Sequence, residues 1–150
     1  MRATGPHPYR GRQLDASGVP PEGKLPMSTF LWTMAGLLAV VFLAAGTMKL
    51  TQPKAKLAAA GQGWVEDFSA TAVKGIGLVE VLAAIGLILP AALDIAPVLV
   101  PLAATGLGLM MVGAAITHTR RREFPLIAVN TVMLALAAVV AWGRFGPHSF

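Results

Sequence analysis

Five polar residues stand inside or beside long apolar stretches of this chain, where each one needs a partner. They are Lys49, Lys74, Glu80, His118 and Asn130. A charged side chain at the centre of a bilayer costs at least about 2.5–3.5 kcal/mol, so such residues pair with one another or serve a function. Glu80 is the clearest case, because its short side chain lies about ten residues from either end of its apolar stretch.

The other four residues lie toward one side of the same predicted membrane layer. Lys74 is ~9 Å nearer to the end of its stretch than Glu80, at ~1.5 Å per helical residue, and can reach the headgroup layer. Lys49 and His118 lie near the same membrane face, and Asn130 lies at a depth comparable to that of Glu80. We therefore predict an intramembrane polar cluster. It is either a structural cluster that fixes the order of the helices, or a site for a small molecule, a quinone or a proton.

Four apolar segments must position these residues, at about 29–50, 70–89, 95–119 and 124–142. A helix that crosses a bilayer needs about 20 such residues. Hydrophobic residues make up 55% of the 150-residue chain and charged residues only 13%, which is too little charge to cover a water-soluble domain. The predicted fold is an all-α integral membrane bundle of four transmembrane helices.

Prolines and glycines predict where these segments begin and end. Pro90 is expected to stop the second segment. Asp94 is placed to cap the third, with Pro97 in its first turn and Pro101 one turn deeper, where it would kink the helix.

The longest connection, residues 51–69, is expected to contain a short helix that starts at Pro53, runs through Ala60 and ends at Gly61 and Gly63. Loops of this length sometimes have a function. This one is interpreted either as a loop that lies on the membrane surface or as a lid over a site.

Aromatic and basic residues at the ends of the segments predict the membrane interfaces and the orientation. The predicted interface anchors are Trp32, Trp64, Trp142, Arg120, Arg121, Arg122 and Arg144. Short cytoplasmic loops carry an excess of Lys and Arg. Counted from Met27, the positive charges favour the loop face, through Lys49, Lys54 and Lys56 and the cluster Arg120, Arg121 and Arg122, so the loops are predicted to be cytoplasmic and both termini extracytoplasmic. With residues 1–26 included, the count is nearly balanced between the two faces.

The first 26 residues differ from the rest. They are rich in proline and glycine, show no hydrophobic periodicity and are predicted to be a disordered tail. Met27 leads directly into the first apolar segment and is an alternative natural start, so residues 27–150 are predicted to form the membrane domain.

Several kinds of chemistry find no support in the sequence. The chain has no cysteine, which excludes disulfides, iron–sulfur clusters and thiol relays. No spacing of its three histidines with acidic residues suggests a metal site or a catalytic constellation. The net charge of +5 is distributed along membrane flanks rather than a groove, so nucleic acid is not expected as a partner.

The apolar segments resemble the DoxX-like family of small membrane proteins between about residues 27 and 147. The resemblance is carried by AAGTMKL, by GLVEVLAAIGLILP, by APVLVPLAATGLGLMMVGAAITH with the following RRRE, and by VNTVMLALAAVVAWGRFGP. It implies a four-helix membrane fold, in a bacterial plasma membrane. Family names refer to terminal oxidases and to thiosulfate:quinone oxidoreductases, so the resemblance also implies a link to redox complexes.

Three hypotheses for function follow. The first is a non-enzymatic membrane component that binds a lipid-like small molecule or another membrane protein, with self-association as a further option. The second is a quinone-linked subunit of an oxidoreductase complex that acts through Glu80 and His118. The third is a small transporter, which would need to dimerise because the sequence shows no internal repeat.

Overall fold

The computed structural model describes residues 27–149, which are almost entirely helical and contain no strand. The elements are α1 (Met27–Thr51), α2 (Lys54–Ala59), the 3₁₀ helix η1 (Gly63–Asp67), α3 (Ala70–Ala92), α4 (Leu99–Arg120) and α5 (Phe124–Phe145). The predicted all-α architecture is thus confirmed. The tail 1–26, predicted to be disordered, lies outside the described residues.

The four long helices have the length and composition of transmembrane segments, as predicted. Each one leaves large apolar side chains uncovered by the rest of the protein. Val40 on α1, Leu82 on α3, Leu109 on α4 and Val132 on α5 are all more than half exposed. Such a surface is stable against lipid and not against water, so the chain is a multi-pass membrane protein.

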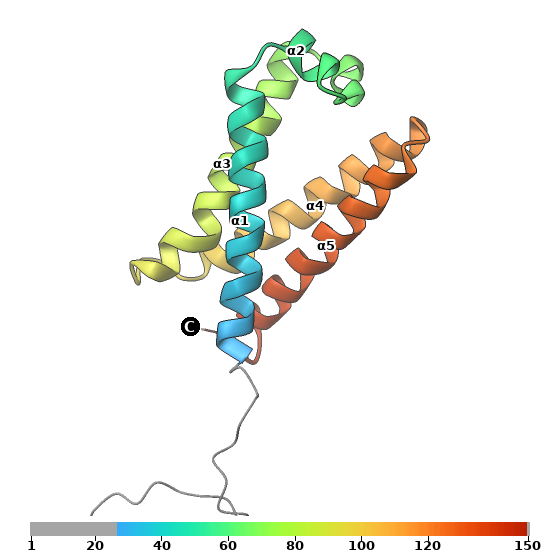
Figure 1. Ribbon diagram of the computed structural model, residues 1–150. Coiled ribbons are helices and arrows are strands. Elements are labelled where there is room, and N and C mark those ends of the chain that lie inside the picture. Colours follow the sequence, from blue (N-terminus) through green and yellow to red (C-terminus); the bar gives the residue numbers. More distant parts are fainter. Residues whose placement is uncertain (1–26, 150) are drawn as a thin grey trace, which may run out of the picture.

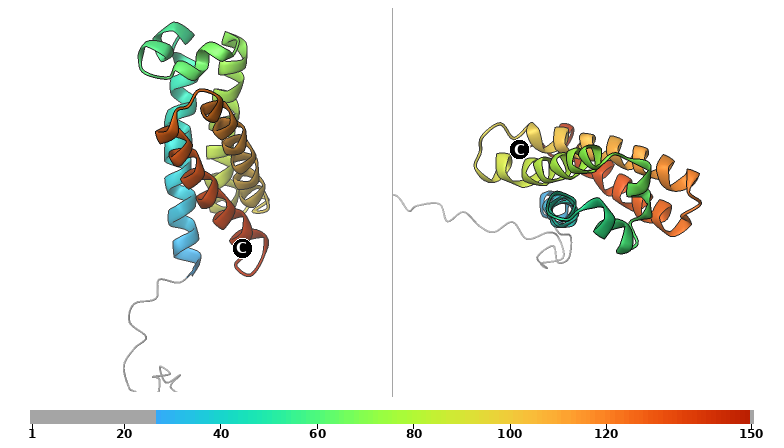
Figure 2. Two further views of the ribbon diagram at one scale, coloured as in Figure 1. Left: turned by 90° about the vertical axis from the view of Figure 1, so that its right-hand side faces the viewer. Right: turned by 90° about the horizontal axis from the view of Figure 1, so that it is seen from above.

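The helices associate as two pairs, α1 with α3 and α4 with α5. The pairs meet near Met27 and the C-terminal end of α5 and diverge toward the loops, as Figure 1 and the view from above in Figure 2 show. At the terminal end α1 and α5 approach closely, since a Cβ atom on Gly143 would lie 2.7 Å from the Leu31 side chain. At the loop end α2 and η1 extend from α1 and α3 toward the turn between α4 and α5 (Figure 1).

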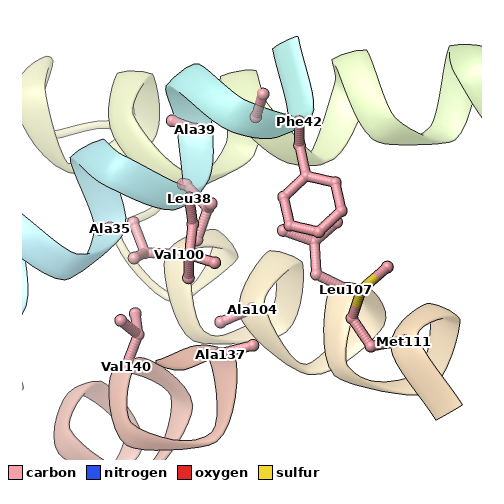
Figure 3. Packing of buried hydrophobic residues seen from close by; sticks show 12 residues of the cluster. Ala35, Leu38, Ala39, Phe42, Val100, Ala104, Leu107, Met111, Ala137 and Val140 are labelled. Carbon is pink, nitrogen blue, oxygen red and sulfur yellow. The ribbon is translucent and has the colours of Figure 1, made fainter. Parts of the chain in front are cut away.

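The hydrophobic core occupies the terminal half of the bundle, where all four long helices meet. Figure 3 shows its buried side chains, among them Leu38 of α1, Leu107 of α4 and Val140 of α5. Phe42 and Met111 stand at the loop-side limit of this core. The core therefore closes the bundle on one side and leaves space above it on the other.

The closest helix crossing joins α1 and α3 at two glycines. A Cβ atom on Gly46 would lie 2.6 Å from the Gly77 carbonyl oxygen and 3.0 Å from Glu80 Cβ. A Cβ atom on Gly77 would lie 2.9 Å from the Gly46 carbonyl oxygen and 2.8 Å from Lys49 Cβ. Each glycine thus makes room both for the opposite backbone and for the charged residue of the opposite helix.

The predicted boundaries of the α3–α4 turn are wrong. Pro90 does not end α3, which continues to Ala92, since the hydrogen bonds from Leu93 N–H to the Leu89 carbonyl and from Ile95 N–H to the Pro90 carbonyl are still made at 3.0 and 2.8 Å. Asp94 does not cap α4; its φ is +53°, in the left-handed region of a turn. Pro97 precedes α4, and Pro101 lies in the first turn of that helix, where the missing N–H leaves no bond unmade and causes no kink.

The connection between α1 and α3 folds as a small unit on the loop side. Pro53 is the N-cap of α2, and Gly61 follows the helix with a φ of +90°, which is as expected for a glycine stop. Leu57, Val65 and Val73 form a second buried cluster beneath this unit. Lys54 Nζ donates to the Phe68 carbonyl oxygen at 2.6 Å and joins the start of α2 to the end of η1. We refer to residues 53–69 as the cap.

The glycine crossing yields a direct test. Gly77→Ala places a methyl group against the Gly46 carbonyl and Lys49, and is expected to destabilise the bundle by about 1–3 kcal/mol through overpacking. The matched control is Gly36→Ala on α1, where no atom lies within 4 Å of the new Cβ. The control should leave the Tm in detergent unchanged or slightly raised, since alanine favours the helix. Equal Tm values for the two variants would show that the crossing is not tight.

Candidate functional site

A cavity of about 430 Å³ lies between the two helix pairs on the loop side of the core. Its residues come from all four long helices and from the cap. They are Val41, Phe42, Ala45, Lys49, Trp64, Phe68, Ile76, Glu80, Met110, Met111, Gly113, Ala114, Thr117, His118, Val129, Asn130 and Met133. Most of these side chains are apolar, with few polar groups among them, which is the usual composition of a small-molecule pocket.

One wall of the pocket carries a buried ion pair between α1 and α3. Lys49 Nζ donates to both carboxylate oxygens of Glu80, at 2.9 and 2.8 Å. The two residues are only 6% and 4% exposed. Because the lysine compensates both oxygens, the pair contributes no net charge to the pocket, and the cost of burying Glu80 is offset.

The cap covers the pocket with two aromatic residues. Trp64 and Phe68 pack edge to face, with ring centroids 5.8 Å apart. The Trp64 ring also lies below Lys49 Nζ, 5.7 Å from the ring centroid, so that it contacts the cation of the ion pair. Trp64 was predicted as an interface anchor, and the structure places it in the pocket wall. The connection therefore contributes two aromatic rings to the pocket wall.

A chain of charged groups links the other pocket wall to the cap. His118 Nδ1 lies 2.6 Å from Glu123 Oε2, and Arg121 Nε donates to Glu123 Oε1 at 2.9 Å. Arg121 also donates from Nη1 to both carboxylate oxygens of Asp67 in the cap, at 3.1 Å each. Glu123 is therefore shared between a pocket residue and the residue that holds the cap.

This chain determines which ring nitrogen of His118 donates to Glu123. The hydrogen bond from Arg121, followed by that with His118, lowers the pKa of Glu123 below its ordinary value. Glu123 is thus an ionised carboxylate, which only accepts hydrogen bonds, so Nδ1 of His118 is the donor. In a neutral imidazole the other nitrogen, Nε2, is then an acceptor, and no residue in 27–149 forms a hydrogen bond with it.

Asn130 adds a polar group without a partner. Its Nδ2 is buried and forms no hydrogen bond within the described part of the chain. Leaving a buried donor unmet costs about 1–3 kcal/mol, so native proteins rarely tolerate it unless something else completes the site. Asn130 is also among the residues that line the pocket.

The structure brings four of the five predicted cluster residues to this pocket: Lys49, Glu80, His118 and Asn130. It places the fifth elsewhere. Lys74 Nζ donates to the carbonyl oxygens of Leu50 and Gln52, at 2.5 and 2.9 Å, and so caps the C-terminal end of α1. This is a favourable place for a cation, because the last carbonyls of a helix carry partial negative charge.

The predicted interface anchors have varied environments. Trp142, Arg120 and Arg122 are exposed at the expected ends of the helices. Arg144 is buried, stacks 5.5 Å from the centroid of the Trp32 ring and donates to the His148 carbonyl oxygen at 3.0 Å. Arg144 therefore fastens the terminal ends of α1 and α5 within the protein.

Sequence reasoning gave no role to Glu123 or Asp67, which orient His118 and hold the cap. The signal for Glu123 was present, since a carboxylate five residues after His118 follows a basic helix end. Asp67 lies 54 positions from Arg121 along the chain, and no spacing pattern could pair them. Met110, Met111 and Met133 were likewise assigned only to apolar segments, yet all three line the pocket.

The fold and the site define a class of protein: a four-helix membrane protein with a pocket between its helix pairs and a cap on one membrane face. The chain belongs to the DoxX-like family, whose model matches residues 33–140, so the resemblance seen in the sequence is confirmed. The comparisons with curated proteins and with solved structures gave no match.

The ion pair is tested by removing its members singly and together. Lys49→Met or Glu80→Leu alone leaves an uncompensated buried charge and is expected to lower stability in detergent by about 3–5 kcal/mol. The double variant removes both charges and should recover most of the loss, measured as Tm or as resistance to chemical unfolding. If the double variant is as unstable as the sum of the single ones, the two residues do not act as a pair.

The hold of Arg121 on the cap is tested by Arg121→Ala, with the exposed neighbouring substitution Arg120→Ala as control. Loss of this partly exposed ion pair should raise the rate of hydrogen exchange of the amides in η1 a few-fold, whereas the control should match the wild type.

Because the pKa of Glu123 is lowered, the contribution of this carboxylate to stability is complete above the ordinary glutamate value of 4.5 and is lost as pH falls through the lowered pKa. The difference between variant and wild type should therefore shrink in acid; a difference independent of pH would contradict this account.

Proposed function

We propose that this protein binds a lipid-like small molecule in the pocket between its two helix pairs. The observation that carries the proposal is the pocket itself: apolar walls from four helices surround a few polar side chains held in fixed positions. Lys49 is held by Glu80, and His118 is held by Glu123. Polar groups positioned in this way orient a ligand at little entropic cost.

The rim of the pocket favours a ligand that arrives from the bilayer. Two of its lining residues, Val41 on α1 and Val129 on α5, are 46% and 53% exposed. Both lie within the membrane-spanning helices, so the pocket meets lipid between α1 and α5, where the helix pairs diverge (Figure 1). An apolar molecule dissolved in the membrane can enter there without crossing water.

Binding rather than catalysis is the function proposed. The Lys49–Glu80 pair engages both carboxylate oxygens internally, which is a structural use of the acid and not that of a proton donor or acceptor. Two pocket residues could act as nucleophiles, and both are engaged: Lys49 donates to Glu80, and Thr117 Oγ1 donates to the Gly113 carbonyl oxygen at 3.1 Å. The ligand would thus be held, carried or sensed.

A second candidate is a quinone-linked membrane subunit, and the unpartnered amide of Asn130 favours it specifically. Its Nδ2 is a donor that a quinone carbonyl can satisfy. In this role the chain would hold the quinone while a partner protein supplies electrons, since the sequence contains no cysteine and no cofactor motif. The two candidates share the pocket and differ in the identity of the bound molecule.

The location proposed for this function is the plasma membrane, with the cap and the α4–α5 turn on the cytoplasmic side. The basic residues Lys54, Lys56, Arg120 and Arg122 support this orientation. The variant Ala60→Cys places one cysteine at an exposed position of this cysteine-free chain, and it should react with an impermeant thiol reagent only after the cells are permeabilised. Reaction in intact cells would reverse the orientation.

The ligand proposal is tested by purification from native membranes. The wild type should retain an apolar compound that solvent extraction and mass spectrometry detect at near-stoichiometric amounts. Ala114→Phe fills the pocket and should lose at least about 90% of it, as a clash in a closed site costs more than 1.4 kcal/mol. Val112→Phe, on the lipid-exposed face of the same helix, is the matched control and should keep it.

Equal amounts of extracted compound in all three proteins would overturn the proposal, because the compound would then be bulk lipid. An extracted quinone would favour the second candidate, and any other compound would favour the first.

A further inference from the structure

We infer that the ligand of this pocket carries a neutral hydroxyl group, in an alcohol or a phenol, that donates to His118 and accepts from Asn130. This inference rests on the proposed function, since it concerns the same pocket. It assigns the chemistry of the polar end of the ligand, which the apolar walls leave open.

His118 is the acceptor of this site. Its Nδ1 donates to the Glu123 carboxylate at 2.6 Å, and Arg121 holds that carboxylate from the other side at 2.9 Å. The ring lines the pocket and is nine-tenths buried, so its orientation is fixed. When the ring is neutral, it presents the lone pair of Nε2, which has no partner among residues 27–149 and which a ligand O–H can satisfy.

Asn130 is the donor of this site. It stands on α5, in a helix hairpin with α4, which carries His118, and both residues line the same cavity. The buried Nδ2 has no acceptor in the described protein. A hydroxyl oxygen accepts one hydrogen bond while its hydrogen donates another, so one small group can complement both residues.

The charges around the pocket disfavour an anionic ligand. Lys49 is the cation in the pocket wall, and both of its strong contacts go to the Glu80 carboxylate. Glu123 adds a negative charge directly behind His118. A carboxylate or phosphate head would leave water without gaining a free positive partner in the described part of the pocket, so a neutral head is favoured.

The test uses the full-length protein in lipid nanodiscs and four probes with the same tail: 4-hexylphenol, 4-hexylanisole, hexylbenzene and 4-hexylbenzoate. Emission of Trp64, which lines the pocket, reports binding in a Trp32→Phe/Trp142→Phe background, and Ala114→Phe gives the signal from lipid partitioning alone. Each Kd is expressed as the ratio of probe to lipid in the nanodisc. The phenol should bind about tenfold more tightly than the anisole, which cannot donate, and the anisole about tenfold more tightly than hexylbenzene, which also cannot accept. The benzoate should bind more weakly than the phenol.

Two variants assign the two hydrogen bonds. His118→Phe should abolish the difference between phenol and anisole, because only the phenol donates to the ring. Asn130→Leu should abolish the difference in Kd between anisole and hexylbenzene. It should leave the difference in Kd between phenol and anisole unchanged. If His118→Phe does not fold, ¹⁵N NMR of histidine-labelled wild type replaces it: the phenol should shift the Nε2 resonance and the anisole should not.

The remaining outcomes overturn the inference. Equal Kd values for phenol and anisole would show that no hydroxyl is recognised, and tightest binding of the benzoate would show an anion site. An oxidised quinone, which only accepts hydrogen bonds, should rank with the anisole. Failure of all four probes to bind would reject the hydroxyl ligand. The proposed function is judged separately, by the compound that copurifies with the wild type and not with Ala114→Phe.

Discussion

The architecture depends on the crossing of α1 and α3. At this crossing a glycine of each helix faces a charged residue of the other helix. Gly46 faces Glu80, and Gly77 faces Lys49, so each helix offers a gap where the other carries its charge. The lysine can then give both of its short bonds to the carboxylate inside an apolar wall. Without the glycines the helices would stand too far apart for this geometry, and without the ion pair a buried charge would remain on each helix.

The pocket exists because the two helix pairs are fastened at opposite places. The first pair is joined near the loops by this crossing, whereas the two pairs are joined to each other near the termini, by the core and by the contact of Gly143 with Leu31. Side chains of Phe42 and Met111 seal the junction and become the floor of the cavity. The space above the floor is thus a consequence of where small residues permit close approach.

The sequence predicted the number and type of the long helices, because a bilayer demands about 20 apolar residues per crossing and little else competes with that signal. It also indicated that polar residues on different helices would be brought together, since burial in lipid penalises each of them alone. The predicted helix boundaries and some predicted contacts were wrong where several local conformations have nearly the same free energy. Pro97 and Pro101 each fit a first helical turn, and α4 begins at Leu99, so Pro101 lies in that turn and Pro97 precedes it. Lys74 had a helix end within reach and caps α1 instead of facing the pocket.

The contacts of Glu123 show which part of the site could be read from the sequence and which could not. It stands at the start of α5 and accepts from His118 on one oxygen and from Arg121 on the other, while Arg121 reaches Asp67 in the cap. The first two contacts are local in the sequence, whereas the contact with Asp67 depends on the three-dimensional meeting of the cap with the α4–α5 turn, which no linear spacing encodes. The orientation of the His118 ring, with Nδ1 donating to Glu123, is consequently determined by ionised groups at the membrane face. The pocket therefore has a ring nitrogen of defined polarity in a wall that is otherwise apolar, and that is the property on which ligand recognition here depends.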